Sequence, residues 1–106
     1  MKEIYRSFEG NLGAGESGYY VLELVDHYEV HELSTRMGVP EYVFRVSKSA
    51  VENPDWTDLY TIGKFETEVR NGSLDGQVYV KGRWYSSESI RKIQNSHKDY
   101  NWQAYI

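Results

Sequence analysis

Two histidines and a glutamate lie close together in the segment His27-Tyr28-Glu29-Val30-His31. On an extended strand the three polar side chains would share one face, and on a helix the histidines would lie one turn apart. Imidazole nitrogens bind zinc and other transition metals, so either geometry could begin a metal site. The zinc-protease motif differs, because glutamate directly follows its first histidine. A solvated strand face is the simpler interpretation, and a metal-dependent enzyme at His27 and His31 is an alternative.

A glycine-rich segment precedes these residues, with Gly13, Gly15 and Gly18 in the order G-x-G-x-x-G. That spacing occurs in dinucleotide-binding folds, where the backbone approaches a pyrophosphate at the start of a helix. Here the residues that follow, YYVLELV, indicate a strand, and Glu16 would place a negative charge beside the phosphates. We therefore expect a loop between two strands and no bound cofactor.

Residues for other kinds of catalysis are few. The chain has no cysteine and no G-x-S-x-G nucleophile motif. Carboxylate pairs such as Asp55 with Asp58, or Glu66 with Glu68, could exchange protons with a substrate, but this spacing is typical of solvated faces. We therefore expect that the protein is not an enzyme and holds no metal.

The charge of the chain is unevenly distributed. Residues 1–76 carry seven Lys or Arg against fourteen Asp or Glu, and residues 77–106 carry five against two. The first part is therefore acidic and the second basic, although the whole chain has a net charge of only −4. An asymmetry of this kind fits either an ordinary solvated surface or an acidic body with a basic edge.

The basic C-terminal part favours nucleic-acid binding as a second alternative. Its cations alternate with tyrosine and tryptophan, and phosphate contacts combined with base stacking need both kinds of side chain. The sequence pI of about 5.3 argues against this function, since nucleic-acid-binding domains are usually basic. The candidate phosphate-binding residues are Lys81, Arg83, Arg91, Lys92 and Lys98.

Residues 77–94 give the clearest structural pattern. Two short apolar runs, 78–80 and 83–85, flank Lys81-Gly82, which predicts a two-residue β-hairpin with Val78, Val80 and Trp84 in the core. Ser86 or Ser87 can cap a helix that follows, with Ile90 and Ile93 on its buried side. This unit would be a scaffold for the rest of the chain.

The remaining chain predicts further strands and one or two short helices. Residues 3–8, 19–33 and 41–47 read as strands, and the long middle one can be continuous or broken near Asp26. Asn53-Pro54-Asp55 is a good helix start, with Trp56, Leu59 and Tyr60 as its apolar side. Residues 62–70 fit a helix or a strand, and we favour a helix or irregular structure. The expected fold is α+β, a mainly antiparallel sheet in a single domain covering residues 1–106.

The overall profile is similar to that of small phage or mobile-element anti-defence proteins, anti-CRISPR proteins among them: a short, acidic, tyrosine-rich chain without cysteine. The resemblance, which is one of profile, implies binding that blocks a target. A protein of this kind would act in the cytoplasm, that of the host if phage-encoded. No segment has the apolar length of a membrane span, and the aromatic C-terminal residues permit a homodimer.

We therefore expect a non-catalytic protein-binding domain, which could inhibit a host nucleic-acid-processing complex by occlusion or by partial nucleic-acid mimicry. Its partner would be a protein or a ribonucleoprotein. Carboxylates would face a basic groove, and aromatic side chains would serve as anchors. The candidate partner-binding residues are Glu23, Glu29, Glu32, Asp55, Asp58, Glu66, Glu68, Tyr100, Trp102 and Tyr105.

Overall fold

The structure is a computed structural model that describes residues 1–38, 40–97 and 101–106. In these residues one antiparallel sheet has six strands in the order β1-β2-β3-β4-β5-β6, so each strand pairs with its neighbours in sequence. This confirms the predicted α+β class. The strands are β1 (Lys2–Arg6), β2 (Ser17–Glu23), β3 (His27–Ser34), β4 (Tyr42–Ser47), β5 (Gly76–Val80) and β6 (Arg83–Ser86).

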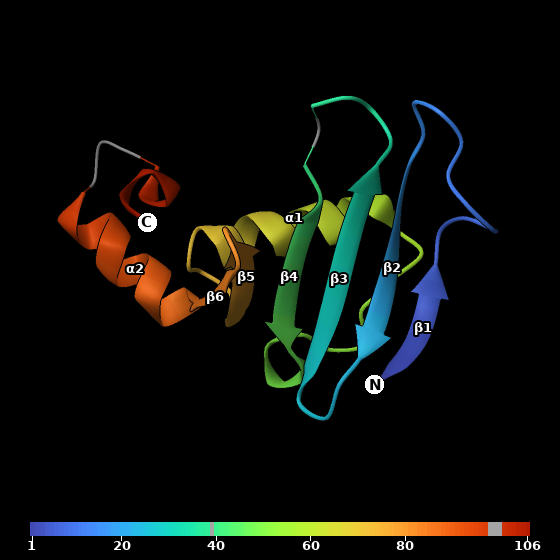
Figure 1. The fold of residues 1–106 in the computed structure, drawn as a ribbon. Coiled ribbons are helices and arrows are strands. Elements are labelled where there is room, and N and C mark those ends of the chain that lie inside the picture. The colour runs from blue at the N-terminus through green and yellow to red at the C-terminus, as the bar shows by residue number, and fades with distance from the viewer. Residues whose placement is uncertain (39, 98–100) are drawn as a thin grey trace.

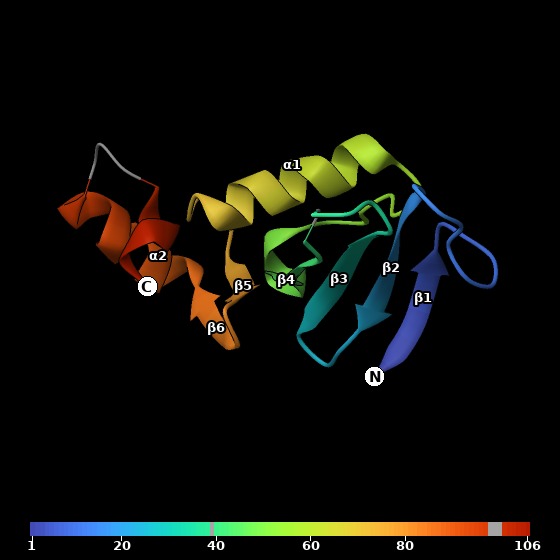
Figure 2. The same cartoon turned by 45° about the horizontal axis from the view of Figure 1, so that its top comes forward.

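Two α-helices accompany this sheet in the described part of the chain, α1 (Leu59–Arg70) and α2 (Ser87–Ser96). Figure 2 shows α1 lying across one face of the sheet, with its first turns towards β2. Helix α2 and the short 3₁₀ helix η2 (Trp102–Tyr105) lie beyond β6, at the opposite end of the structure from β1 (Figure 1). The first 3₁₀ segment, η1 (Lys48–Ala50), follows β4. Neither described helix has the length and apolar character needed to cross a membrane.

The predicted hairpin and helix at residues 77–94 are confirmed. Lys81 and Gly82 both have positive φ, 50° and 83°, as the tight turn between β5 and β6 requires. The Ser86 hydroxyl accepts a hydrogen bond from the Ser89 amide and caps α2. The prediction of Trp84 as a core residue is wrong, because Val78 pairs with Tyr85 across the hairpin and Trp84 therefore points to the other face.

The long middle segment forms the broken alternative, β2 and β3, joined by a turn at residues 24–26. Because of this turn, the side chains of β2 and β3 do not alternate between the two faces of the sheet as they would along one unbroken strand. Val21 pairs with Val30, and both are fully buried, whereas Leu22 pairs with Glu29. In one unbroken strand Leu22 and Val30 would share a face, whereas the turn places them on opposite faces.

Helix α1 confirms the helical interpretation of residues 62–70 and corrects the predicted start. The helix begins at Leu59, and Asp58 caps it by accepting a hydrogen bond from the Tyr60 amide. Ile62 and Val69 are fully buried, while Leu59 and Tyr60, predicted to face the core, are 68% and 78% exposed. The buried side of α1 packs on β4 and β5.

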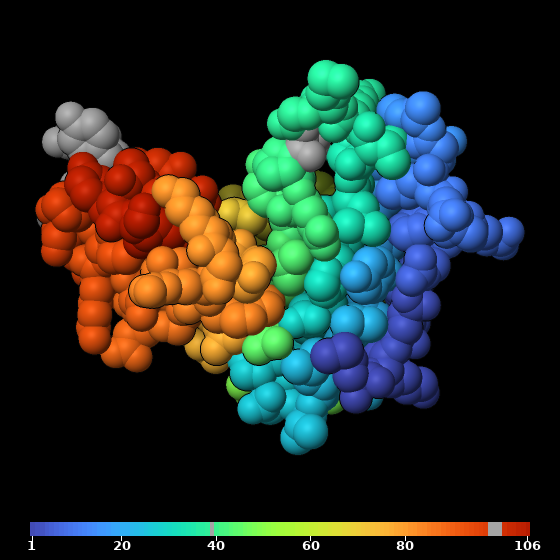
Figure 3. Space-filling model, in the orientation of Figure 1, coloured from blue at the N-terminus to red at the C-terminus, as the bar shows by residue number. Residues whose placement is uncertain are grey.

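The core lies between α1 and the sheet and continues under α2. Phe44, Val46 and Val78 from the sheet meet Ile62 and Val69 of the helix there. Alternation along β4 puts Phe44 and Val46 on this side. One face of the sheet is therefore covered, and the other, seen in Figure 3, is not covered by α1.

Candidate functional site

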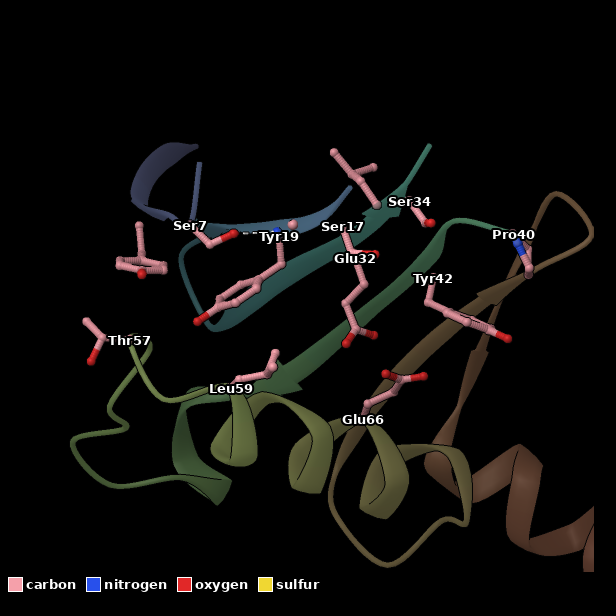
Figure 4. Close-up of a pocket in the computed structure, with 13 residues that line it drawn as sticks. Ser7, Ser17, Tyr19, Glu32, Ser34, Pro40, Tyr42, Thr57, Leu59 and Glu66 are labelled. Carbon is pink, nitrogen blue, oxygen red and sulfur yellow. Dashed lines mark hydrogen bonds between the residues drawn. The ribbon is translucent and has the colours of Figure 1, made fainter. Parts of the chain in front are cut away.

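A cavity of about 550 Å³ opens between the N-terminal strands of the sheet and the first turns of α1. We call it the cleft. Its walls come from β1, β2, β3 and β4 and from α1 with the residues that precede it (Figure 4). Cavities of this size commonly accommodate small molecules or side chains of a partner. The lining residues are Tyr5, Ser7, Ser17, Gly18, Tyr19, Glu32, Leu33, Ser34, Pro40, Tyr42, Thr57, Leu59 and Glu66.

Two carboxyl groups face each other inside the cleft. Figure 4 shows Glu32 pointing from β3 towards Glu66, which points up from α1. The register of the sheet places Glu32 between Tyr19 of β2 and Tyr42 of β4. Strand and helix thus bring together two of the acidic residues that the sequence analysis selected, although they are far apart in the chain.

The environment of Glu32 favours its neutral form. Burial raises the pKa of the Glu32 carboxyl, and a hydrogen bond and the charge of Glu66 raise it further, to about 9. Two ionised carboxylates would have no donor between them, and Glu32 Oε2 is buried without a hydrogen-bond partner among the residues that the structure describes. One proton shared by the pair would supply the donor. At neutral pH the Glu32 carboxyl therefore keeps its proton.

Arg70 is the cation that contacts this carboxyl pair, on the side of α1. Arg70 Nε donates to Glu66 Oε1 at 3.1 Å, one turn along α1, and its guanidinium lies over the Tyr42 ring, 4.6 Å from the ring centroid. Arg70 lowers the pKa of Glu32, but its effect is the smallest of those that act on this carboxyl. Among the described residues that line the cleft, none is a lysine, an arginine or a histidine.

Tyrosines form the wall of the cleft on the sheet side. The Tyr19 hydroxyl donates to the Trp56 carbonyl at 2.7 Å, and the Tyr5 and Tyr19 ring centroids are 5.5 Å apart. Burial, with smaller contributions from Tyr5, Asp58 and Asp55, raises the pKa of Tyr19 to about 12. The two aspartates therefore add negative potential at this end of the cleft.

Asp55 and Asp58 also have structural partners. Asp58 Oδ1 accepts from the Tyr60 amide, and Asp58 Oδ2 accepts from the Thr61 hydroxyl at 2.9 Å. Asp55 Oδ1 accepts from both the amide and the hydroxyl of Thr57. These contacts fix the segment that leads into α1, so the aspartates combine a capping role with their electrostatic effect.

The glycine-rich segment is a loop between β1 and β2, as predicted. Its last glycine, Gly18, lies in β2 and permits a close approach, because a Cβ there would be 2.5 Å from Phe8 Cδ1. The Thr35 hydroxyl ties the loop to the end of β3 by donating to the Gly13 carbonyl at 2.6 Å. The loop thus helps to form the rim of the cleft.

Glu29 lies on the opposite face of the sheet from Glu32. It is 5% exposed and accepts from Arg45 Nε at 2.8 Å and contacts His31 Nε2 at 3.0 Å. Burial raises the pKa of Glu29, but the hydrogen bonds from His31 and Arg45 outweigh it, so the pKa lies below its usual value. Glu29 therefore belongs to a charge network of this face.

The histidines of the suggested metal site are held by carboxylates. His31 Nδ1 contacts Glu41 at 3.1 Å and the His31 ring stacks on Tyr20, while His27 Nδ1 contacts Asp26 at 2.7 Å. Within residues 1–38, 40–97 and 101–106, no group of three or more His, Cys, Asp or Glu could hold a metal ion. The Trp84 ring lies under the Arg45 guanidinium, 4.1 Å from it, and so adjoins this network.

The other acidic candidates lie apart from the cleft. Glu23, at the far end of β2, approaches Lys48 Nζ at 3.7 Å. Glu68, on α1, borders a shallow hollow with Tyr60 and Lys64 on the outer side of the helix. Of the predicted acidic residues, Glu32 and Glu66 therefore line the cleft, whereas Glu23 and Glu68 lie outside it.

Three of the basic candidates that the structure describes contact groups of the protein itself. Lys81 Nζ donates to the Ile106 carbonyl at 3.1 Å, Lys92 pairs with Glu88 at 3.3 Å, and Arg91 donates to the Gly72 carbonyl. Arg83 is exposed beside the β5–β6 turn. Lys98 lies outside the described residues.

The aromatic candidates near the C-terminus differ in exposure. Trp102 is 2% exposed, and its Nε1 donates to the Arg70 carbonyl at 2.7 Å, which places it in the core. Tyr105 is 42% exposed and stacks on His97 with ring centroids 3.6 Å apart. Tyr100 lies outside the described residues.

The sequence analysis missed the tyrosines of the cleft and Arg70. One signal pointed to the site: alternation from Tyr28 and Val30 continues to Glu32, which puts an acidic residue on the core side of β3. An acidic residue at such a position needs a proton, a cation or a solvated opening.

Comparisons of the chain with protein-family models, with curated proteins and with solved structures found no match.

Proposed function

We propose that this protein is a non-catalytic binding domain that takes a basic segment of a partner protein into the cleft. The observation that carries the proposal is the pairing of Glu32 with Glu66 in a cavity whose described lining includes no basic residue. A cavity of one charge sign, with low-dielectric walls, attracts groups of the opposite sign and strengthens their contacts. Asp55 and Asp58 extend the negative potential beyond the carboxyl pair.

The remaining lining suits a peptide. Tyr5 and Tyr42 offer partly exposed aromatic surfaces at a small entropic cost, which is why tyrosine is common at binding interfaces. The hydroxyl groups of Ser7, Ser34 and other rim residues can exchange hydrogen bonds with a backbone. An extended segment with a cation between two small residues would use both kinds of contact.

The proposal includes the class of partner. Proteins that process nucleic acids present lysine and arginine to phosphates, and a carboxylate cleft can engage the same side chains. An inhibitor that occludes such a protein, as the profile of the chain suggests, would need these contacts. The basic residues of the C-terminal unit support direct nucleic-acid binding less well, because Lys81, Arg91 and Lys92 already contact groups of the protein itself.

The test uses an eight-residue peptide of alternating glycine and lysine, with a glycine–glutamate peptide of equal length as its negative counterpart. Amide chemical shifts mapped by NMR should change around Tyr19, Glu32 and Glu66 with the basic peptide alone. The double variant Glu32→Gln/Glu66→Gln should weaken binding about tenfold or more, since hydrogen bonds to charged groups are lost.

A charge-matched control is available. Glu23→Gln/Glu68→Gln removes two carboxylates outside the cleft and should change the affinity less than about twofold, because exposed charges act weakly at a distance. Equal losses in the two double variants would show a general charge effect and contradict the proposal. Steeply salt-dependent retention of a single-stranded oligonucleotide, with shifts at Arg83 and Lys92, would favour the nucleic-acid alternative instead.

A further inference from the structure

We infer that Glu32 and Glu66 form a subsite for one ammonium group, which displaces the proton that the two carboxyls share when the cleft is empty. The inference rests on the proposed function and specifies which group of the basic segment reaches the floor of the cleft. No covalent bond to carbon changes: an O–H bond of the pair breaks, the proton passes to the buffer, and the N–H groups of the ammonium replace it as donors.

The geometry of the pair is that of a site with one donor missing. Glu32 and Glu66 approach from different elements, a strand and a helix, and their carboxyl groups point towards each other in the cleft (Figure 4). Glu32 Oε2 is buried and has no partner among the described residues. A cation placed between the carboxyls would satisfy that oxygen as well as a proton does.

The charges around the pair leave room for one more cation. Arg70 approaches Glu66 on α1 and rests on Tyr42 of β4, so it compensates one carboxylate. The Tyr19 hydroxyl of β2 donates a hydrogen bond to the Trp56 carbonyl, and Asp55 and Asp58 contribute further negative charge on that side. The second carboxylate therefore needs a proton or a ligand cation.

An ammonium group fits this subsite better than a guanidinium. Its three donors radiate from one small nitrogen, so it can contact two carboxyls from opposite elements at once. A guanidinium is planar and needs a carboxylate edge to pair with two donors. Arg70 already lies against Glu66, which obstructs a second planar group there.

The test measures the protons released on binding. The glycine–lysine peptide is titrated into the protein at pH 7 by calorimetry in phosphate, HEPES and Tris, whose ionisation enthalpies differ. We expect release of about one proton per lysine bound in the cleft, because the pKa of Glu32 is about 9 in the free protein. The affinity should rise about tenfold from pH 7 to pH 8, since the competing proton becomes ten times scarcer while the lysine stays charged.

Two variants test whether the proton released on binding comes from Glu32. Glu32→Gln should bind the peptide with proton release near zero, whereas Glu68→Gln should release as many protons as the unmodified chain. A glycine–arginine peptide should bind the cleft more weakly than the lysine peptide.

The outcomes separate the two proposals. Binding in the cleft with no proton exchange, or release that persists in Glu32→Gln, would overturn the inference and leave the proposed function standing. An arginine peptide that binds at least as tightly would overturn the preference for ammonium. Absence of any binding by basic peptides would overturn both.

Discussion

Two glutamates of one strand show how strongly position decides the state of a carboxyl group. Glu29 and Glu32 are three residues apart in β3 and point to opposite faces. On one face the hydrogen bonds from His31 and Arg45 hold the pKa of Glu29 below its usual value, and on the other burial and Glu66 raise the pKa of Glu32 to about 9. The sequence shows two acidic residues, but their neighbours across the sheet are unknown until the strands pair.

The raised pKa of Glu32 predicts how stability depends on pH. Between the usual value of 4.5 and about 9, the folded chain keeps a proton that the unfolded chain has lost. The folded state is therefore stabilised at low pH, and this contribution is lost as the pH rises through that window. Replacing Glu32 by Gln removes the titration, and the variant should be more stable than the unmodified chain by about 1–3 kcal/mol at pH 8.

Urea unfolding at pH 5.5 and pH 8 measures this effect. The gain in the free energy of unfolding should be smaller at pH 5.5, where less of the proton-linked cost applies. Glu68→Gln is the matched control on α1 and should show no comparable change with pH. Equal gains for Glu32→Gln at both pH values would show that the pair does not titrate as described.

At the scale of elements, most of the sequence patterns led to the correct structure. The β5–β6 hairpin followed from Lys81-Gly82, because local turn chemistry determines that geometry. The start of α1 did not follow from Asn53-Pro54. The Trp56 carbonyl accepts from Tyr19, and the Trp56 ring packs edge-on against Tyr28 and Phe65, so tertiary contacts hold this segment outside the helix.

The pairing of β4 with β5 depends on Gly76. A Cβ at this position would lie 2.1 Å from the Arg45 carbonyl oxygen and 3.1 Å from Val69 Cγ2. Gly76→Ala should therefore push β5 away from β4 and from α1, and we expect a loss of about 3 kcal/mol or more in the free energy of unfolding. Chemical denaturation checks the change.

Gly63 is the matched control for this substitution. It lies inside α1 on the exposed side, where a Cβ would meet no atom of the described residues within 4 Å. Gly63→Ala should stabilise the protein by about 0.5–1 kcal/mol, because alanine is the better helix former. A similar destabilisation by both substitutions would mean that the close contact at Gly76 is not the cause.

At the scale of the whole molecule, Trp102 joins the C-terminal unit to the rest. Its ring lies 5.7 Å from that of Tyr85, and its Nε1 donates to the carbonyl of Arg70, the last residue of α1. The residue types of Trp102 and Tyr105 do not show whether these aromatics lie in the core or at an interface. An aromatic pattern alone does not distinguish the two, because both environments favour the same side chains.

Trp102→Ala should lower the free energy of unfolding by about 3 kcal/mol, since it leaves a cavity and an unsatisfied carbonyl at the end of α1. Hydrogen exchange should accelerate most in α2 and η2, with smaller changes in β2 and β3. Tyr105→Ala alters a ring that is 42% exposed and should cost clearly less. Uniform acceleration through the whole sheet would argue against a local joining role.

The acidic character of the cleft was predictable only in part. Charge counts identified an acidic region, and the candidate list contained Glu32, Glu66, Asp55 and Asp58. Their assembly depends on α1 crossing the sheet, which no local pattern specifies. Trp102 and Glu29 were also selected by residue type. Packing places Trp102 in the core and Glu29 on the face of the sheet opposite to Glu32.

The nearest-neighbour order of the six strands has a consequence for biosynthesis. Each strand can pair as soon as the next one leaves the ribosome, so β1 to β4 need no later residue to form their ladder. Loops between sequence neighbours also lose little entropy on closure, which favours rapid folding. The nascent sheet would expose one apolar side until α1 emerges, and a pause in translation after β4 would lengthen the period in which chaperones can bind it.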